Sequence, residues 1–196
     1  MNIQDQCVQK YSELKHLKLT GEALGIPWQT VYVHLKNSGV AVTGDKARYG
    51  SVSDRLAVHA ERLFAKSVLG ANDNNNLKYQ ATVDFEIGGV LIDVKAGMLK
   101  EERIERSGKK TSARWLFCIS KQKDISDFFV LYAFDGDLDN PALKHVFLLP
   151  SEIATTKTTI SIPSNLKSKW ADYEVRPTDL ASFFEALAAD QSKVSA

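Results

Sequence analysis

The sequence predicts an α/β domain of the α+β kind, with a mixed central β-sheet flanked by helices, preceded by a small helical module. Three patterns indicate this arrangement. Over residues 82–87, apolar and polar residues alternate with a period of two, and apolar runs follow, as is typical of β-strands. Helical periods stand on both sides of these strands, at residues 54–66 and 177–189. Separate helical patterns occupy residues 1–39, so we expect a boundary near residue 50, between a 1–50 module and a 51–196 domain.

The expected strands of the domain follow one another after the 54–66 helix. Apolar runs suggest strands at residues 114–120, 127–134 and 144–149, each bounded by turn-forming or polar residues. Residues 155–162 are expected to form an edge strand. This order of elements favours a mixed sheet.

The composition excludes several classes of protein. The chain has 196 residues, of which 44% are hydrophobic and 25% charged, as in soluble globular proteins. The net charge is +1, so any contact with nucleic acid must use local basic patches. The longest apolar run, Phe128 to Phe134, is too short to span a bilayer. Cys7 and Cys118 lie far apart without ligand spacing, and we expect reduced thiols in a cytoplasmic protein that has no membrane partner.

Residues 19–39 resemble a helix-turn-helix module and follow a helical pattern over residues 1–17. Gly21 is the small residue at which the two helices approach closely. Gly25 is the turn glycine, where a positive φ is tolerated. We expect the buried positions of the turn and second helix to be Ile26, Val31 and Leu35.

The second helix of this module is expected to present polar and aromatic side chains outward. Pro27 suits its first turn, because the backbone N–H groups of a first turn have no partner within the helix and proline lacks this group. In helix-turn-helix proteins this element is the recognition helix, which enters the major groove of DNA. The resemblance therefore implies DNA contacts by Trp28, Gln29, Thr30, Tyr32 and Lys36, and Val33 is expected to face outward beside them. An ordinary helical hairpin is the alternative interpretation.

Residues 82–97 indicate two β-strands joined at a Gly88-Gly89 pair, which is a hairpin signal. The alternation places Asp84 and Glu86 on one face of the first strand. It places Asp93 and Lys95 on one face of the second strand. A buried strand that carries Asp and Lys two residues apart must compensate their desolvation. These two side chains either pair with each other or hold a ligand.

Asp84, followed after eight residues by Asp93-Val94-Lys95, resembles the signature of the PD-(D/E)xK nuclease superfamily. In that family the first Asp and the acidic residue of the tripeptide bind one or two Mg²⁺ ions. The Lys helps to position the attacking water. An acidic residue from a preceding helix often completes the site, and Glu61 matches that role. Val83 stands where the family has Pro.

The resemblance implies a restriction-endonuclease-like fold over roughly residues 54–150. It implies a metal-dependent phosphodiesterase that uses Mg²⁺, with Mn²⁺ as a possible substitute. The implied catalytic residues are Glu61, Asp84, Asp93 and Lys95, and the implied metal ligands are Asp84, Asp93, the Val94 carbonyl and Glu61. Glu86 is the alternative acidic ligand.

The structural alternative is a solvated network between Asp93 and Lys95 on a sheet edge. Glu13-Leu-Lys15 also fits the tripeptide, but it lies in a helical pattern without an upstream acidic partner. The spacing from Asp84 and the hairpin context are therefore what favour an active site.

Residues 99–114 carry six basic and three acidic side chains and no sustained apolar period. We expect an exposed, mobile loop beside the active-site strand. It is either a solvated connection or a phosphate-binding element that uses Lys109, Lys110 and Arg114.

Two functions from different classes fit these patterns. The first is a Mg²⁺-dependent DNA endonuclease with an N-terminal DNA-binding module. The second is a helix-turn-helix regulator whose nuclease-like domain is an inactive dimerisation scaffold. The presence of Asp84, Asp93 and Lys95 together favours the enzyme. Because one site cuts one strand, a homodimer or a dimer of dimers is the expected assembly.

Overall fold

The computed structural model describes residues 1–42, 50–76, 81–104, 106, 108, 110–154 and 157–194, with residues 76 and 190–194 described by their backbone alone. The chain divides into two compact units. The first comprises Met1–Arg55 with Asp73–Ala81, and the second comprises Leu56–Asn72 with Thr82–Ala196. The sequence did not indicate that a segment after residue 72 would join the first unit.

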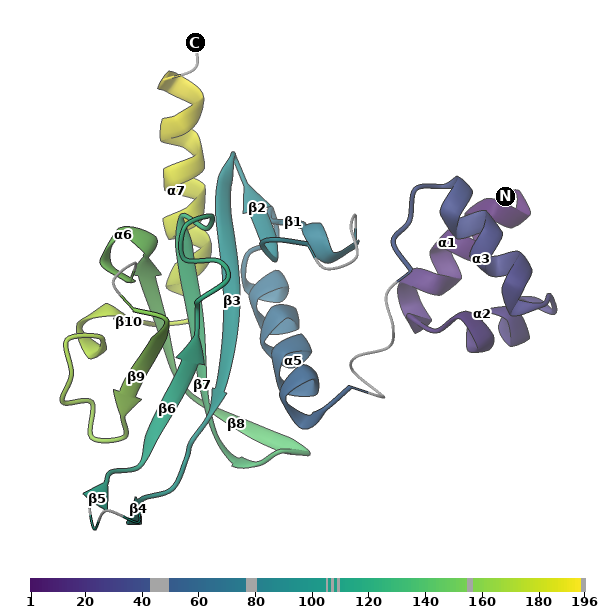
Figure 1. The fold of residues 1–196 in the computed structure, drawn as a ribbon. Helices are drawn as coiled ribbons and strands as arrows, with labels where there is room; N and C mark the ends of the chain where they lie inside the picture. Colours follow the sequence, from purple (N-terminus) through teal and green to yellow (C-terminus); the bar gives the residue numbers. More distant parts are fainter. Residues whose placement is uncertain are drawn as a thin grey trace. The chain divides into compact units, whose positions relative to one another are not determined.

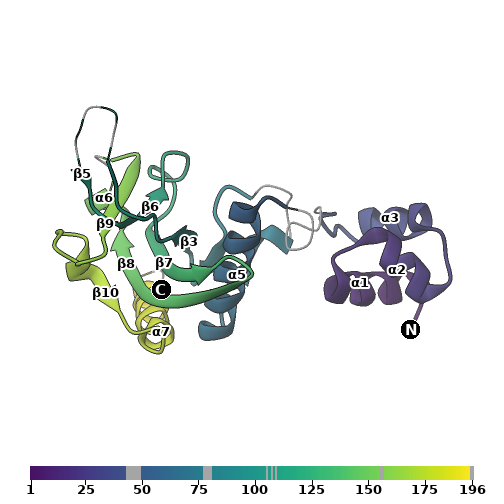
Figure 2. The ribbon, with the colours of Figure 1, turned by 90° about the horizontal axis from the view of Figure 1, so that it is seen from below.

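The first unit is built on three helices: α1 (Ile3–Leu14), α2 (Leu17–Leu24) and α3 (Trp28–Asn37) (Figures 1 and 2). The predicted helix over residues 1–17 therefore ends earlier, at a Lys15 with φ of 49°. The core of the unit consists of Cys7, Tyr11, Val31 and Leu35. Val31 and Leu35 are buried as the sequence predicts, whereas Ile26 is only partly buried.

The turn between α2 and α3 depends on two glycines. Gly25 has a φ of 68°, a conformation that residues with a Cβ rarely adopt. A Cβ at Gly21 would lie 2.5 Å from the carbonyl oxygen of Ile26, so only glycine allows the turn to approach α2 this closely. Pro27 directly precedes α3, one residue before the predicted position. These contacts give the first unit a compact helix–turn–helix pair.

The second unit contains a six-stranded sheet in the order β1-β2-β3-β7-β8-β10. Strand β3 pairs parallel with β7, while the pairs β2–β3, β7–β8 and β8–β10 are antiparallel. The mixed central sheet that the sequence predicts is therefore present. The strands are β1 (Asn72–Asp73), β2 (Phe85–Ile87), β3 (Val90–Met98), β7 (Phe128–Asp137), β8 (Asn140–Pro150) and β10 (Glu174–Val175).

Two helices cover one face of this sheet. They are α5 (Val52–Ser67) and α7 (Asp179–Val194) (Figure 1). Their buried side chains, among them Phe64 and Phe184, pack with Ile92 and Val94 of β3. Even-numbered residues of β3 therefore face the helices.

The other face of the sheet is covered by a second, two-stranded sheet of β6 (Arg114–Cys118) and β9 (Thr159–Pro163). Their side chains form a separate core with Phe129 and Leu131 of β7. Helix α6 (Ser151–Ala154) and Trp170 contribute to this core, and the short helices η1 (Asn74–Asn76) and η2 (Ala171–Tyr173) connect strands. The strand predicted over residues 155–162 is thus β9; residues 155–156 lie outside the described residues.

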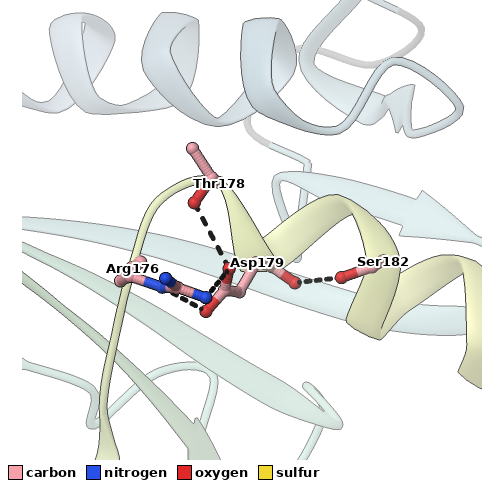
Figure 3. A network of polar contacts seen from close by, with 4 residues as sticks. All are labelled: Arg176, Thr178, Asp179 and Ser182. Carbon is pink, nitrogen blue, oxygen red and sulfur yellow. Dashed lines mark hydrogen bonds and ion pairs between the residues drawn. The ribbon is translucent and has the colours of Figure 1, made fainter.

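Side-chain interactions stabilise the starts of both long helices. The N–H and hydroxyl of Ser51 donate to the Asp54 carboxylate, and the Asp54 N–H donates back to the Ser51 hydroxyl, which is a capping box at α5. At α7, the Arg176 guanidinium donates two hydrogen bonds, of 2.9 and 3.0 Å, to the Asp179 carboxylate (Figure 3). The hydrogen bond from Arg176 holds the pKa of Asp179 below its usual range, so a carboxylate remains charged beside the helix N-terminus.

Residues 99–114 differ from the predicted loop. They contain β4 (Arg103–Ile104) and β5 (Lys110–Thr111), which pair with each other antiparallel. The segment is exposed as predicted, but it is a β-ribbon, because its backbone groups pair with each other. No helix within the described part of the chain is both long and apolar enough to cross a membrane.

Candidate active site

Strands β2 and β3 form a hairpin that separates after three residue pairs. Gly88 and Gly89 connect them, with φ of 56° and 84°, as the glycine pair predicts. Pairing runs from Ile87 opposite Val90 to Phe85 opposite Ile92, and continuation of that register would place Asp84 opposite Asp93.

Where this pairing ends, the Asp84 carboxylate takes the place of the backbone carbonyl that would otherwise pair with β3. Its Oδ2 accepts a hydrogen bond of 2.8 Å from the N–H of Val94. A side chain therefore satisfies the N–H at the edge of β3. Residues 81–84 are not part of the strand, although the sequence predicted a strand from residue 82. Residues 77–80 lie outside the described residues. The hydrogen bond fixes Asp84 beside β3 and next to Asp93.

Asp93 and Lys95 lie on the face of β3 that β6 covers. In the parallel pairing with β7, Asp93 stands opposite Phe129, which belongs to the core under β6 and β9. Two residues beyond Lys95, a Cβ at Gly97 would lie 2.8 Å from the Phe117 ring of β6. The two charged side chains therefore share one face, as the period of two predicts.

Asp93 is a buried charge with incomplete compensation. Its side chain is 2% exposed, and Lys95 Nζ lies 2.6 Å from its Oδ2. Apart from this ion pair, Oδ2 has no hydrogen-bond partner among the described residues. Burial, reinforced by the charge and hydrogen bonding of Asp84, raises the pKa of Asp93 to about 7, against the opposing effect of Lys95. A further cation at this carboxylate would be stabilising.

The arrangement fits a small divalent cation. Asp84 and Asp93 supply hard oxygen atoms, and Mg²⁺ is commonly bound through one or two carboxylates together with water and phosphate. Apart from its ion pair with Lys95, the buried Oδ2 of Asp93 has no hydrogen-bond partner among the described residues, so it can offer such an ion an oxygen ligand. No group of three or more His, Cys, Asp or Glu side chains that could hold a metal occurs within the described ranges.

Glu61 and Glu86 do not join Asp84 and Asp93 in such a group. Glu61 lies in α5, whose apolar side packs on the helix-covered face of the sheet. Asp93 lies on the opposite face of the sheet. The ligand roles of Glu61 and Glu86 remain predictions.

Sequence reasoning missed the polar residues that follow β6. Cys118 is exposed and lies 3.3 Å from the Ser120 hydroxyl, measured from Sγ to Oγ. This hydrogen bond lowers the pKa of Cys118, and the positive charges of Lys95 and Lys121 lower it further. Cys118 therefore lies near Lys95. The packing of β6 over β3 brings it there, so local spacing gave no signal.

Asp127 was also missed, and it positions the active-site strand. Its N–H donates to the Leu91 carbonyl at 2.8 Å, and its Oδ2 accepts from the Leu91 N–H at 2.7 Å. These two hydrogen bonds fix the start of β3 beside the start of β7.

The predicted DNA-contacting residues lie on the surface where the structure describes them. In α3, Trp28, Tyr32 and Val33 are exposed apolar side chains. Gln29, Thr30 and Lys36 are exposed as well. In the ribbon, Lys110 pairs with Glu102 at 2.7 Å, and Arg114 donates to the Ser112 carbonyl at 3.0 Å. Lys109 lies outside the described residues.

The sequence matches no protein-family model and no curated protein. Among solved structures, the chain is similar to a bacterial homing endonuclease, I-Ssp6803I, with a TM-score of 0.43 and 15% sequence identity. The match covers 70% of this chain and 95% of that chain.

Asp93→Asn is expected to stabilise the protein when divalent ions are chelated. Because the pKa of Asp93 is raised from 3.8 to about 7, folded wild type binds its proton more tightly than unfolded wild type. Wild-type stability should therefore fall between these pH values relative to the variant. Above them, the variant should be more stable by on the order of 1–2 kcal/mol, less than the full pKa effect because the Asn amide needs partners of its own.

Urea unfolding across this pH range measures the difference. Asp124→Asn is the matched control, since that carboxylate is 74% exposed. A wild type that is as stable as Asp93→Asn, or more stable, above pH 7 would show that the buried charge carries no cost.

Proposed function

We propose that the protein is a Mg²⁺-dependent DNA endonuclease of the PD-(D/E)xK type, which hydrolyses phosphodiester bonds with water. The observation that carries the proposal is the buried Asp93, held beside Asp84 with Lys95 Nζ 2.6 Å from its carboxylate. A buried acid with a strongly raised pKa and specific charged partners is typical of functional sites. Retaining such a group costs stability, and metal-dependent hydrolysis gives it a role.

Each side chain has a defined part in this proposal. Asp84 and Asp93 would hold the metal, with the Val94 carbonyl as a further ligand and Glu61 acting through the outer shell or at a second ion. A bound Mg²⁺ would make a water molecule a better nucleophile and offset charge on the phosphate, and Mn²⁺ would substitute for it. The Val94 N–H keeps Asp84 oriented before substrate arrives, which lowers the cost of reorganisation.

Lys95 would act on the reacting groups directly. Its ammonium carries three donors, and its side chain is 22% exposed, so it is accessible to solvent as well as to Asp93. From this position it would orient the attacking water and stabilise the charge that develops on the phosphate oxygens. We also place the protein in the cytoplasm, on the basis of its two free thiols.

Asp93→Asn and Lys95→Ala are each expected to reduce DNA cleavage by about 100- to 1,000-fold, because each removes charge that acts on the transition state. DNA affinity should stay near that of wild type, since it comes from other basic and polar residues. Cleavage of linear, supercoiled and branched DNA, with Mg²⁺, Mn²⁺ or a chelator, measures the first effect, and gel shifts measure the second.

Glu13→Gln is the control, because Glu13 belongs to the unrelated tripeptide in α1 and pairs with Lys10 on the surface. Wild-type cutting by either active-site variant would refute the assignment of this site. A wild type that binds DNA and cuts none of these substrates would favour the regulator with an inactive scaffold.

We further propose that α3 contributes much of the DNA affinity through its exposed face. Tyr32→Ala and Lys36→Gln should each weaken binding about tenfold, the loss typical of a good base or phosphate contact. Lys10→Gln in α1 is the matched control, since it removes an exposed cation from the same unit without changing α3. Fluorescence anisotropy with labelled duplex DNA measures the affinities. Equal affinities for all four proteins would exclude α3 as a DNA-reading helix.

We propose a homodimer or a dimer of dimers as the active assembly, because two sites allow both strands of a duplex to be cut. Sedimentation analysis with and without DNA is expected to show an even number of subunits per complex. A single subunit bound to each duplex would contradict the proposed assembly.

A further inference from the structure

The basic segment after β3 is ordered by one continuous register. Arg103 stands opposite Thr111, and Ile104 stands opposite Lys110. At its base, Lys100 stands opposite Arg114, and each donates its backbone N–H to the other's carbonyl at 2.9 Å. The three pairs fit a single antiparallel register. Even-numbered residues of the ribbon therefore share one face.

This register assigns to the two faces of the ribbon the basic and acidic residues that are interspersed in the sequence. The even-numbered face of residues 100–104 and 110–114, here called the even face, carries three cations and one carboxylate: Lys100, Lys110, Arg114 and Glu102. Two contacts agree with this placement: Lys110 Nζ lies 2.7 Å from Glu102 Oε1, and Arg114 Nη2 donates to the Ser112 hydroxyl at 3.0 Å. Among the described residues of the opposite face, Arg103 and Glu101 balance each other. The excess of positive charge is thus concentrated on the even face.

Ile104 is the apolar side chain of the even face. It is 75% exposed, although it is a large β-branched residue in a strand. It contributes to neither core of the second unit, so packing within the protein does not explain it. Its cross-strand partner is Lys110, which brings an apolar group and a cation to the same position.

We propose that the even face enters the major groove of duplex DNA, where its cations contact phosphates and Ile104 contacts a thymine methyl group. The major groove admits a two-stranded ribbon, and thymine presents its C5-methyl group there as an apolar contact. The excess of positive charge complements the phosphate backbone. The inference rests on the proposed DNA substrate and assigns to Ile104 a role in sequence preference.

Position in the fold supports this role. The ribbon continues directly from β3, the strand that carries Asp93 and Lys95, and the Leu99 N–H between them is anchored to the Phe134 carbonyl at 2.8 Å. DNA held by the ribbon would therefore be held by an extension of the active-site strand itself.

The test uses the full chain and equilibrium binding to linear duplex DNA in a chelator, so that no cleavage is needed. Lys100→Gln should weaken binding and reduce the slope of log affinity against log salt by about 0.9. Arg103→Gln is the matched control: it removes a cation from the opposite face and should leave both quantities unchanged. Unchanged affinity and slope for Lys100→Gln would overturn the proposal.

Ile104→Ser tests the contact with thymine. Wild type should bind a thymine duplex about fourfold more tightly than the same duplex with deoxyuridine in place of thymidine, the factor expected for burial of one methyl group. Ile104→Ser should bind the two equally. A wild type without this preference, or a variant that retains it, would overturn the role of Ile104.

Cleavage in Mg²⁺, measured in parallel, separates this inference from the proposed function. If wild type cuts DNA and both ribbon variants bind as wild type does, the ribbon inference fails while the nuclease stands. If the ribbon variants show the expected losses and wild type cuts nothing, the ribbon inference holds and the nuclease fails.

Discussion

The hydrogen bond from the Val94 N–H to the Asp84 carboxylate determines the geometry on which the candidate site depends. It ends the pairing of β2 with β3 after three residue pairs, because a side chain takes the place of the partner backbone. It also holds Asp84 beside Asp93, at the position where a continued register would pair the two residues across β2 and β3.

This arrangement raises the free energy of the charged form of Asp93. Its carboxylate lies on the face between the central sheet and β6, where burial disfavours charge more strongly than Lys95 compensates it. The rest of the unit supports the strand that carries it. Hydrogen bonds between Asp127 and Leu91 fix the start of β3, and the absence of a side chain at Gly97 lets Phe117 of β6 approach closely. A rigid strand that presents an undercompensated acid is suited to binding a cation.

The features that the sequence predicted well depend on residues close together in the chain. The Gly88-Gly89 pair and the alternation around it gave the hairpin and the shared face of Asp93 and Lys95. Gly21 and Gly25 gave the turn between α2 and α3. The mixed sheet followed from the succession of apolar strands.

What could not be predicted depends on pairing between distant segments. The ribbon of β4 and β5 has no apolar period, and its even face emerges only from its register. Cys118 lies near Lys95 only because β6 folds over β3. The position of Glu61 depends on which face of the sheet α5 covers, and helical periodicity does not specify that face.

The most direct test of the account is the thermal stabilisation of the protein by Mg²⁺. An ion that binds only the folded state raises stability by about 2.7 kcal/mol at a hundred times its dissociation constant. We expect MgCl₂ to raise the melting temperature of wild type relative to KCl of equal ionic strength, and to leave Asp93→Asn unchanged. Equal effects of Mg²⁺ on both proteins, or no effect on wild type, would contradict a metal site at Asp84 and Asp93.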